Sequence, residues 1–331
     1  MRFLIAGLGS IGRRHLHNLI SLGQKDIILF RTHHSTLPDD ELNVFPVEHN
    51  LDVALTCKPD AVIISNPTAL HLEIAIPAAE RGCALLIEKP LSNNLNRIEE
   101  LKIEVEKSAA RVLVGFQFRF HPGLCKIRSL LDEKAIGRVL YVRSQWSEFL
   151  PGWHLWEDYR KGYSARSDLG GGVVLTLCHP IDFLRWFFGE VEQVNAFVSK
   201  LSDLEIQVED CAEIILHFAS GILGSLHLDF IQQPPKHILE ITGTEGIIKW
   251  CYTDGKAHLY RNSTNQWETF PISPGYERNM MFMEEMRHFI EVVKDRSDPI
   301  CNLEDGVIAQ VIIDAIYRSS KTASRVTIHG N

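Results

Sequence analysis

The chain has 331 residues, of which 45% are hydrophobic and 23% are charged, and its formal net charge at pH 7 is −8. This length allows two sizeable cores, and the composition is typical of a globular protein rather than a disordered one. The acidic balance argues against a nucleic-acid partner, because domains that bind nucleic acid usually present a basic surface.

The sequence gives no sign of a membrane anchor or of a disulfide framework. No apolar run approaches the roughly 20 residues that a membrane-spanning helix needs, so no membrane association is expected. The seven cysteines are odd in number, scattered, and without a CxxC pair. Neither a disulfide framework nor a thiolate zinc site is therefore indicated, and we predict a cytoplasmic protein.

Short β-rich runs alternate with helical stretches in the first third of the chain. The runs cover residues 2–6, 26–30, 61–65, 84–87 and 112–115. Such alternation predicts a doubly wound parallel sheet with helices on both faces, which is a Rossmann α/β domain over residues 1–120.

Two helices of this domain have identifiable local signals. Residues 70–81 read as helix, but Pro77 lies inside them and predicts a kink or a broken first turn. Asn94 is expected to cap a further helix, in which apolar residues recur at helical spacing from Leu95 to Val105.

The pattern changes after residue 120, where long strands follow one another. They are expected at residues 139–149, 191–199, 208–218, 222–231 and 237–242. The glycine turns "FASGIL" and "GTEGII" favour antiparallel pairing. We predict an α+β domain with an open, mostly antiparallel sheet over residues 121–331. Its last two helices, 281–294 and 303–319, pack across the sheet or back on the first domain.

The segment "GLGSIG" lies directly after the first strand and opens a helix. Its residues are Gly7, Gly9, Ser10, Ile11 and Gly12. Glycines in this context let the backbone approach a pyrophosphate, which then lies on the free N–H groups of the helix. The loop therefore predicts a dinucleotide site. Arg13 and Arg14 follow it at the helix N-terminus, where an anionic ligand would offset their unfavourable charge.

The second strand ends in "LFRTHHS", which lacks the Asp or Glu that usually binds the ribose hydroxyls of NAD. Arg31 is suited to a 2′-phosphate instead, so NADP is favoured over NAD, although a solvent-facing arginine is the alternative reading. His33 and His34 are adjacent and lack a third ligand at useful spacing, so no metal site is predicted.

Two further strands end in polar segments, and ligands of open α/β sheets bind beyond the carboxyl ends of strands. The segments are "SNP" at 65–67 and "EKP" at 88–90. We therefore expect a shared cofactor border, although a surface lysine before a turn is the commoner fate of Lys89. The residues predicted at this border are Ser65, Asn66, Pro67, His71, Glu88, Lys89 and Gln117.

Four segments together, "GLGSIG", "SNPTALH", "EKPLS" and "GGGVVLTLCHPIDFLRWFFG", resemble the Gfo/Idh/MocA oxidoreductase family over nearly the whole chain. The resemblance implies an NAD(P)-dependent enzyme acting on a sugar or nucleotide sugar, and a homodimer or homotetramer. It also implies that Lys89 contacts the reacting hydroxyl and the nicotinamide ribose, and that His179 serves as acid/base.

The chemistry agrees with these two catalytic assignments. Removing a hydride from a secondary alcohol needs a proton acceptor and a cation that stabilises the alkoxide. Many family members place an Asp about one turn before this histidine, where Leu175 and Thr176 stand here. Either Asp182 orients the ring from one helical turn away, or Lys89 and His179 work as a pair.

An irregular loop, residues 151–172, is rich in aromatic and charged residues, and such loops carry recognition. Some of these side chains are expected only to pack or form salt bridges. Together with residues near the cleft, the candidates for substrate contact are Arg119, Trp153, His154, Trp156, Tyr159, Arg160, Arg166 and Asp182.

Two other functions stay open at this point. The resemblance also covers glycosidases that use NAD transiently and show no net redox change. The second alternative is a binding protein that keeps its affinity for the nucleotide but has lost catalysis, because the usual Asp before the histidine is missing.

Overall fold

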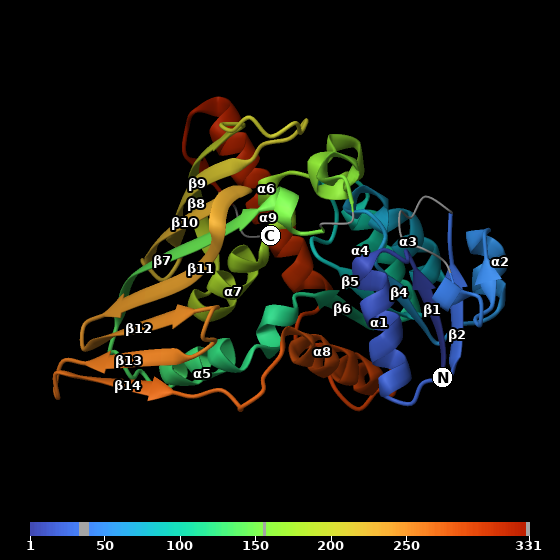
Figure 1. Ribbon diagram of the computed structural model, residues 1–331, viewed down its shortest axis with the longest axis horizontal. Coiled ribbons are helices and arrows are strands. Elements are labelled where there is room, and N and C mark those ends of the chain that lie inside the picture. The colour runs from blue at the N-terminus through green and yellow to red at the C-terminus, as the bar shows by residue number, and fades with distance from the viewer. Residues whose placement is uncertain (33–39, 155–156, 329–331) are drawn as a thin grey trace. The chain divides into compact units, whose positions relative to one another are not determined.

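The computed structural model describes residues 1–32, 40–154 and 157–328. The chain folds into two compact units, and each unit is built from segments that are separated in the sequence (Figure 1). The first comprises Met1–Gln117, Asp168–Gly170 and Arg278–Gln310. The second comprises Phe118–Ser167, Gly171–Glu277 and the chain from Val311 onward. His33 and His34 lie outside the described residues.

The first unit contains a six-stranded parallel sheet in the order β3-β2-β1-β4-β5-β6. The strands are β1 (Arg2–Ala6), β2 (Asp26–Phe30), β3 (Val47–Glu48), β4 (Ala61–Ile64), β5 (Ala84–Glu88) and β6 (Val112–Gly115). The predicted Rossmann sheet is thus confirmed, and the short β3 is added to it. β4 and β5 are buried along their whole length, as expected for strands covered on both faces.

Five α-helices lie wholly within the described part of this unit. They are α1 (Ser10–Ser21), α2 (Leu51–Thr56), α3 (His71–Glu80), α4 (Ile98–Ser108) and α8 (Arg278–Val293). α1 packs beside α8, α3 packs beside α4, and both α3 and α8 contact β5. α8 comes from the far end of the sequence, so the core of this unit is completed late in the chain.

One local prediction in this unit was wrong. α4 begins at Ile98 rather than after Asn94, because the Asn94 side chain accepts a hydrogen bond from the Asn96 N–H at 2.7 Å and closes a turn. The predicted helix around Pro77 is α3, which continues to Glu80 and is preceded by a short 3-10 turn, Thr68–Leu70.

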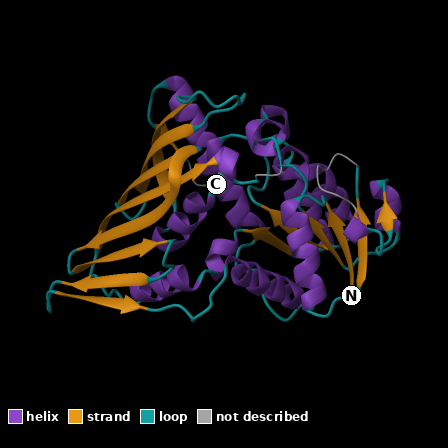
Figure 2. Cartoon of the chain, viewed as in Figure 1, coloured by secondary structure: helices purple, strands orange, loops and turns teal. Residues whose placement is uncertain are grey.

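The strands of the second unit form a large sheet, coloured orange in Figure 2. It has nine strands in the order β14-β13-β12-β11-β7-β10-β9-β8-β15. Its strands are β7 (Val139–Phe149), β8 (Val191–Ser199), β9 (Cys211–Phe218), β10 (Leu223–Asp229), β11 (Ile231–Gly243), β12 (Gly246–Cys251), β13 (Ala257–Arg261), β14 (Gln266–Phe270) and β15 (Val326–Thr327). All neighbours pair antiparallel except β7 and β10, which are parallel. The predicted open, mostly antiparallel sheet is confirmed.

One face of this sheet is buried and the other is exposed. On β9, Ala212, Ile214 and Leu216 are buried, whereas Ile215 between them is 50% exposed. Such alternation is the usual pattern of an antiparallel sheet with one covered face. The remaining α-helices of the described chain are α5 (Pro122–Asp132), α6 (Val173–Thr176), α7 (His179–Phe188) and α9 (Leu303–Thr322). Among the described residues, no helix combines the length and apolar character needed to cross a membrane.

Candidate active site

The glycine loop joins β1 to α1 and packs tightly against the segment after β4. Gly7 has a φ of +91°, and a Cβ there would overlap the backbone of Asn66. A Cβ on Gly12 would overlap the carbonyl oxygen of Gly7. Two of the three glycines are therefore required by close backbone packing.

The third glycine leaves the start of α1 open. A Cβ on Gly9 would meet nothing within 4 Å, and Gly9 is the N-cap residue of α1, with no side chain to bond the first N–H groups. The first turn of a helix has N–H groups without intrahelical acceptors, and here no acidic side chain lies in that turn. This open, uncapped N-terminus fits the pyrophosphate of a dinucleotide.

The arginines of α1 have partners within the protein. Arg13 donates from Nε to the Leu8 carbonyl at 3.0 Å and from Nη1 to Glu41 at 2.5 Å. Arg14 donates to Asn279 at 3.2 Å, and its guanidinium lies 4.7 Å from the ring centre of Phe282. The expectation that an anionic ligand accounts for these two charges is therefore replaced by ordinary side-chain pairing.

The segment after β4 is tied to its neighbours on both sides. Ser65 Oγ donates to the Gly7 carbonyl at 2.9 Å. His71 places Nδ1 3.0 Å from the Pro90 carbonyl oxygen and Nε2 3.0 Å from that of Asn66. Burial lowers the pKa of His71, so the ring is neutral and donates to one carbonyl at a time. With 1% of its surface exposed, His71 joins the two loops and has little surface left for a cofactor.

Glu88 is the last residue of β5, and the half-buried Lys89 follows it at the carboxyl end of the sheet. Glu88 Oε1 accepts from His15 Nε2 at 2.8 Å, and Oε2 accepts from the Lys89 N–H at 3.2 Å. Among the described residues, His15, Glu88 and Glu285 form the one group of three side chains spaced as metal ligands, within 4.8 Å of one another. The sequence reasoning missed His15 and Glu285, because helical periodicity explained both.

Arg119 and Asp182, predicted to contact substrate, bind each other. The Arg119 guanidinium donates from Nε at 3.0 Å and from Nη2 at 2.7 Å to the Asp182 carboxylate. Their side chains are 3% and 2% exposed. This burial argues against direct contact of either with a sugar, so both are better read as a structural ion pair. Gln117, in the 3-10 turn after β6, is 3% exposed.

His179 is the first residue of α7 and lies among aromatic rings. Its ring centre is 4.9 Å from that of Phe118 and 6.0 Å from that of Trp146. Trp146 in turn stacks on His237 at 4.2 Å. His237 Nε2 lies 2.9 Å from Glu148 Oε1. Trp146, Glu148 and His237 were not predicted as site residues, because their strands are long and nothing in the local sequence distinguishes these positions.

The glycines before His179 are held by a half-buried acid that the sequence reasoning also missed. Gly172 has a φ of +111°, and a Cβ there would overlap the Glu209 carboxylate. Glu209 accepts from the Tyr317 hydroxyl at 2.6 Å and from the Val174 N–H at 3.4 Å. The pKa of Glu209 is raised by burial. This contact fixes the start of α6, two turns before His179.

The predicted recognition loop is largely engaged with itself and its neighbours. Trp153 Nε1 donates to Glu148 at 3.2 Å, and the Tyr159 hydroxyl accepts from the Glu205 N–H at 3.2 Å. Arg160 is exposed and forms salt bridges with Asp158 and Glu205. His154 and Arg166 are half-buried. Trp156 lies outside the described residues.

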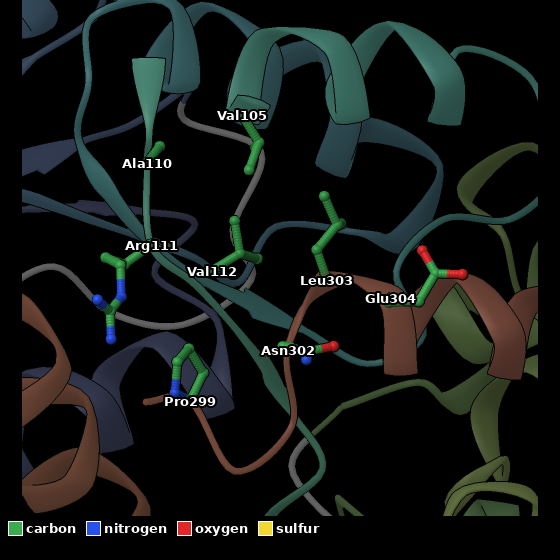
Figure 3. A pocket seen from close by; sticks show the side chains of 8 residues that line it. All are labelled: Val105, Ala110, Arg111, Val112, Pro299, Asn302, Leu303 and Glu304. Carbon is green, nitrogen blue, oxygen red and sulfur yellow. The ribbon is translucent and has the colours of Figure 1, made fainter. Parts of the chain in front are cut away.

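A cavity of about 210 Å³ lies in the first unit, beside the start of β6 (Figure 3). It is lined by Val105, Ala110, Arg111, Val112, Pro299, Asn302, Leu303 and Glu304. This is the amino end of the strand, whereas ligands of open parallel sheets bind at the carboxyl ends. The cavity is therefore not the expected cofactor site.

Two family models match the chain. The description "Oxidoreductase family, NAD-binding Rossmann fold" matches residues 1–116. The description "Oxidoreductase family, C-terminal alpha/beta domain" matches residues 128–328.

Known relatives and solved structures resemble the chain over most of its length. A myo-inositol 2-dehydrogenase of Thermotoga maritima is 28% identical, over 96% of each chain. A D-xylose 1-dehydrogenase (NADP(+)) of Haloferax volcanii is 26% identical, over 81% of this chain and 80% of its own. A levoglucosan dehydrogenase in complex with NADH shares the fold, with a TM-score of 0.88 and 20% identity over the whole of both chains. The chain therefore belongs to the Gfo/Idh/MocA family of oxidoreductases and begins with that family's NAD-binding Rossmann fold.

Proposed function

We propose that the chain is an NAD(P)-dependent dehydrogenase that transfers a hydride between nicotinamide and a secondary hydroxyl of a sugar, polyol or nucleotide sugar. The observation that carries this proposal is the place of Lys89. It follows β5 at the edge of the sheet where the glycine loop follows β1 and Ser65 follows β4. That edge is where a parallel sheet of this kind binds a dinucleotide.

The cofactor border combines three segments of the first unit. The open N-terminus of α1, at Gly9, Ser10 and Ile11, would hold the pyrophosphate, while Asn66 and Pro67 after β4 and Gln117 after β6 would border the nicotinamide side. Gly7, Gly12 and His71 act by holding these segments together. A nicotinamide, when bound, supplies the carbon that accepts or returns the hydride.

Lys89 and His179 are assigned the two remaining tasks of the reaction. As the hydroxyl loses its hydride, negative charge develops on its oxygen, and the Lys89 ammonium stabilises that charge. His179 takes the hydroxyl proton, since an imidazole exchanges protons near neutral pH. The reverse direction uses the same groups in the opposite sense.

The aspartate that many family members carry before His179 is absent here, and ring packing is proposed to do its positioning work. Phe118 and Trp146 contact the imidazole from two separate segments. Contacts of this kind restrict the ring to one orientation, which a catalytic base needs.

We also propose NADP as the preferred cofactor. Arg31 follows β2, where an NAD-specific site usually offers an acid to the ribose. The named relatives include an NADP-dependent enzyme, and a structural neighbour holds NADH. Replacing Arg31 with Asp should lower kcat/KM with NADP+ at least about tenfold relative to NAD+. An unchanged ratio would contradict this assignment.

The substrate class is drawn from the relatives, which are named for inositol, xylose and levoglucosan. Trp153, His154 and Arg166 stay candidates for contacts to a sugar. The glycosidase and the non-catalytic binding protein gain no support from relatives that are named dehydrogenases.

A homodimer or homotetramer is proposed from the exposed face of the second sheet. Large apolar side chains gather on four neighbouring strands: Tyr141 (37% exposed), Phe197 (72%), Ile215 (50%) and Leu223 (52%). Such a patch commonly marks an interface between proteins. Light scattering should give a mass of at least two chains. A cytoplasmic location stays a prediction from the cysteine pattern.

The function is tested with purified protein and a panel of polyols, sugars and nucleotide sugars, each with NAD+ and NADP+, followed by nicotinamide absorbance. At least one substrate should give sustained reduction of the cofactor. Lys89→Met should lower kcat about 10³-fold or more and leave cofactor affinity nearly unchanged. Full activity of that variant would remove the role assigned to Lys89.

A further inference from the structure

Three ionisable side chains meet inside the first unit, beneath the turn that carries Lys89. His15 comes from α1, Glu88 from the end of β5 and Glu285 from α8. Their ligand atoms lie within 4.8 Å of one another, and the residues are 0%, 6% and 0% exposed. Burial makes a second uncompensated negative charge in this place very unfavourable, so the two carboxyl groups must differ in protonation.

The hydrogen bonds identify Glu88 as the ionised member. Both of its oxygens accept, one from His15 Nε2 at 2.8 Å and the other from the Lys89 N–H at 3.2 Å. With Glu88 ionised, His15 Nε2 is the donor of this bond, because a carboxylate has no proton to donate. Burial opposes ionisation of Glu88, but the His15 hydrogen bond and the nearby charges outweigh it and hold its pKa below the usual value.

Glu285 is the neutral member. Among the described residues, neither of its carboxyl oxygens has a hydrogen-bond partner, and the side chain is completely buried. Burial, reinforced by the charge on Glu88, raises the pKa of Glu285 well above its usual value.

The charged and titratable groups around Glu88 come from every element packed on it. They are His15 on α1, Glu285 on α8, His71 on α3 and Lys89 in its own turn. His71 is neutral and bonded to two carbonyls, so it supplies no fixed charge. Lys89 supplies a fixed positive charge beside Glu88, and His15 holds Glu88 through a hydrogen bond.

We propose that Glu88 is a positioning residue for the reaction: ionised and held by His15, it fixes the Lys89 peptide N–H and favours the charged ammonium of Lys89, while Glu285 stays a neutral acid. The inference rests on the proposed function, because Lys89 is its point of action. It assigns different roles to two buried carboxyl groups, Glu88 and Glu285, that lie close together in the structure.

The matched variants are Glu88→Gln and Glu285→Gln, which keep the shape of each side chain and remove only the ability to ionise. Glu88→Gln should lower kcat about 10–100-fold, with cofactor Kd within about threefold. The alkaline limb of its kcat profile should move to lower pH by about one unit, because the ammonium loses a nearby negative charge. Glu285→Gln should keep kcat within about threefold and the same alkaline limb.

Melting curves against pH test the cluster without any turnover. Because the folded-state pKa of Glu285 is raised, its neutral form contributes stability below the usual carboxyl pKa, and this contribution is lost as pH rises through the raised value. The melting temperature of the wild type should therefore fall relative to Glu285→Gln as pH rises. This result is expected even if no polyol or sugar is turned over, so it separates failure of the proposed function from failure of the cluster assignment.

Three results would overturn the inference. One is equal loss of kcat in Glu88→Gln and Glu285→Gln. Another is an alkaline limb that does not move in folded Glu88→Gln. The third is a stoichiometric metal ion in the purified protein that is absent from both variants. If Glu88→Gln fails to fold, Glu88→Asp replaces it: the shorter carboxylate should keep the alkaline limb near the wild-type position while lowering kcat.

Discussion

The two side chains assigned to catalysis lie in opposite kinds of surroundings. Beside Lys89, Glu88 is bonded to His15 and faces a second buried carboxyl group, so charge and hydrogen bonds dominate. Beside His179 lie the rings of Phe118 and Trp146. We propose that the charge of Lys89 is favoured by its charged neighbour Glu88, whereas the rings restrict the orientation of His179 in either protonation state.

The strongest test of this contrast is His179→Asn. It should lower kcat about 10²–10⁴-fold, since a positioned general base contributes that much, and leave the melting temperature nearly unchanged. Trp146→Phe is the control for the packing role: it keeps an apolar ring but shortens the contact, so kcat should fall much less. Activity of His179→Asn within tenfold of the wild type would remove the histidine from the mechanism.

The second test asks whether buried charge in the second unit is structural. Arg119→Met leaves the Asp182 carboxylate buried without its partner, and Asp182→Leu does the same to the Arg119 guanidinium. Each should lower the free energy of unfolding by about 3–5 kcal/mol. The double variant Arg119→Met/Asp182→Leu should recover much of this loss. Urea denaturation measures all three, and additive losses in the double variant would show that the two side chains are not coupled.

Two substitutions in the glycine loop distinguish the glycine that is needed for packing from the glycine that is proposed to leave room for the cofactor. Gly12→Ala places a methyl group on the Gly7 carbonyl, so the unfolding free energy should fall by about 1–3 kcal/mol. Gly9→Ala meets open space, so its stability should stay near that of the wild type while cofactor Kd rises. Equal loss of stability in both variants would show that the open approach at Gly9 is not real.

The smallest effect is expected on the exposed face of the second sheet. His227 is hydrogen-bonded to Asp229 at 2.8 Å and to Glu213 at 2.6 Å. Both bonds raise the pKa of His227, and the bond to Asp229 has the larger effect. The contribution of His227 to the free energy of unfolding is therefore present below the ordinary histidine pKa, and it is lost as pH rises through the raised pKa. His227→Gln should lose at most about 1 kcal/mol at about pH 6 and nothing at about pH 9. A loss that persists at alkaline pH would point to packing instead.

The contrast between the two surroundings also explains what the sequence could reveal. The Gly7 loop, Ser65 and Lys89 each follow a short buried strand directly, so local order along the chain predicted their common edge of the sheet. Lys89 and Glu88 are neighbours in sequence, and their pairing needs no tertiary information. Prediction was therefore strongest where the functional groups are local.

The rest depends on contacts between distant segments. Glu285 lies nearly 200 positions from Glu88, and Glu209 more than 100 from Tyr317, so no spacing rule connects them. Trp146 and His237 meet across the paired strands β7 and β11, where alternation shows which residues are buried but not which rings stack. The sequence suggested the nearby His179 as one possible partner of Asp182, but it gave no sign of the bond to Arg119, which lies 63 positions away.

The split composition of the first unit bears on protein engineering. A fragment that ends at Gln117 would hold the complete parallel sheet but lack α8, the helix that packs beside α1 and carries Glu285. If only the amino-terminal segment were exchanged between relatives to change cofactor specificity, α1 from one protein would have to pack against α8 from another. Successful chimeras should need both segments from the same parent.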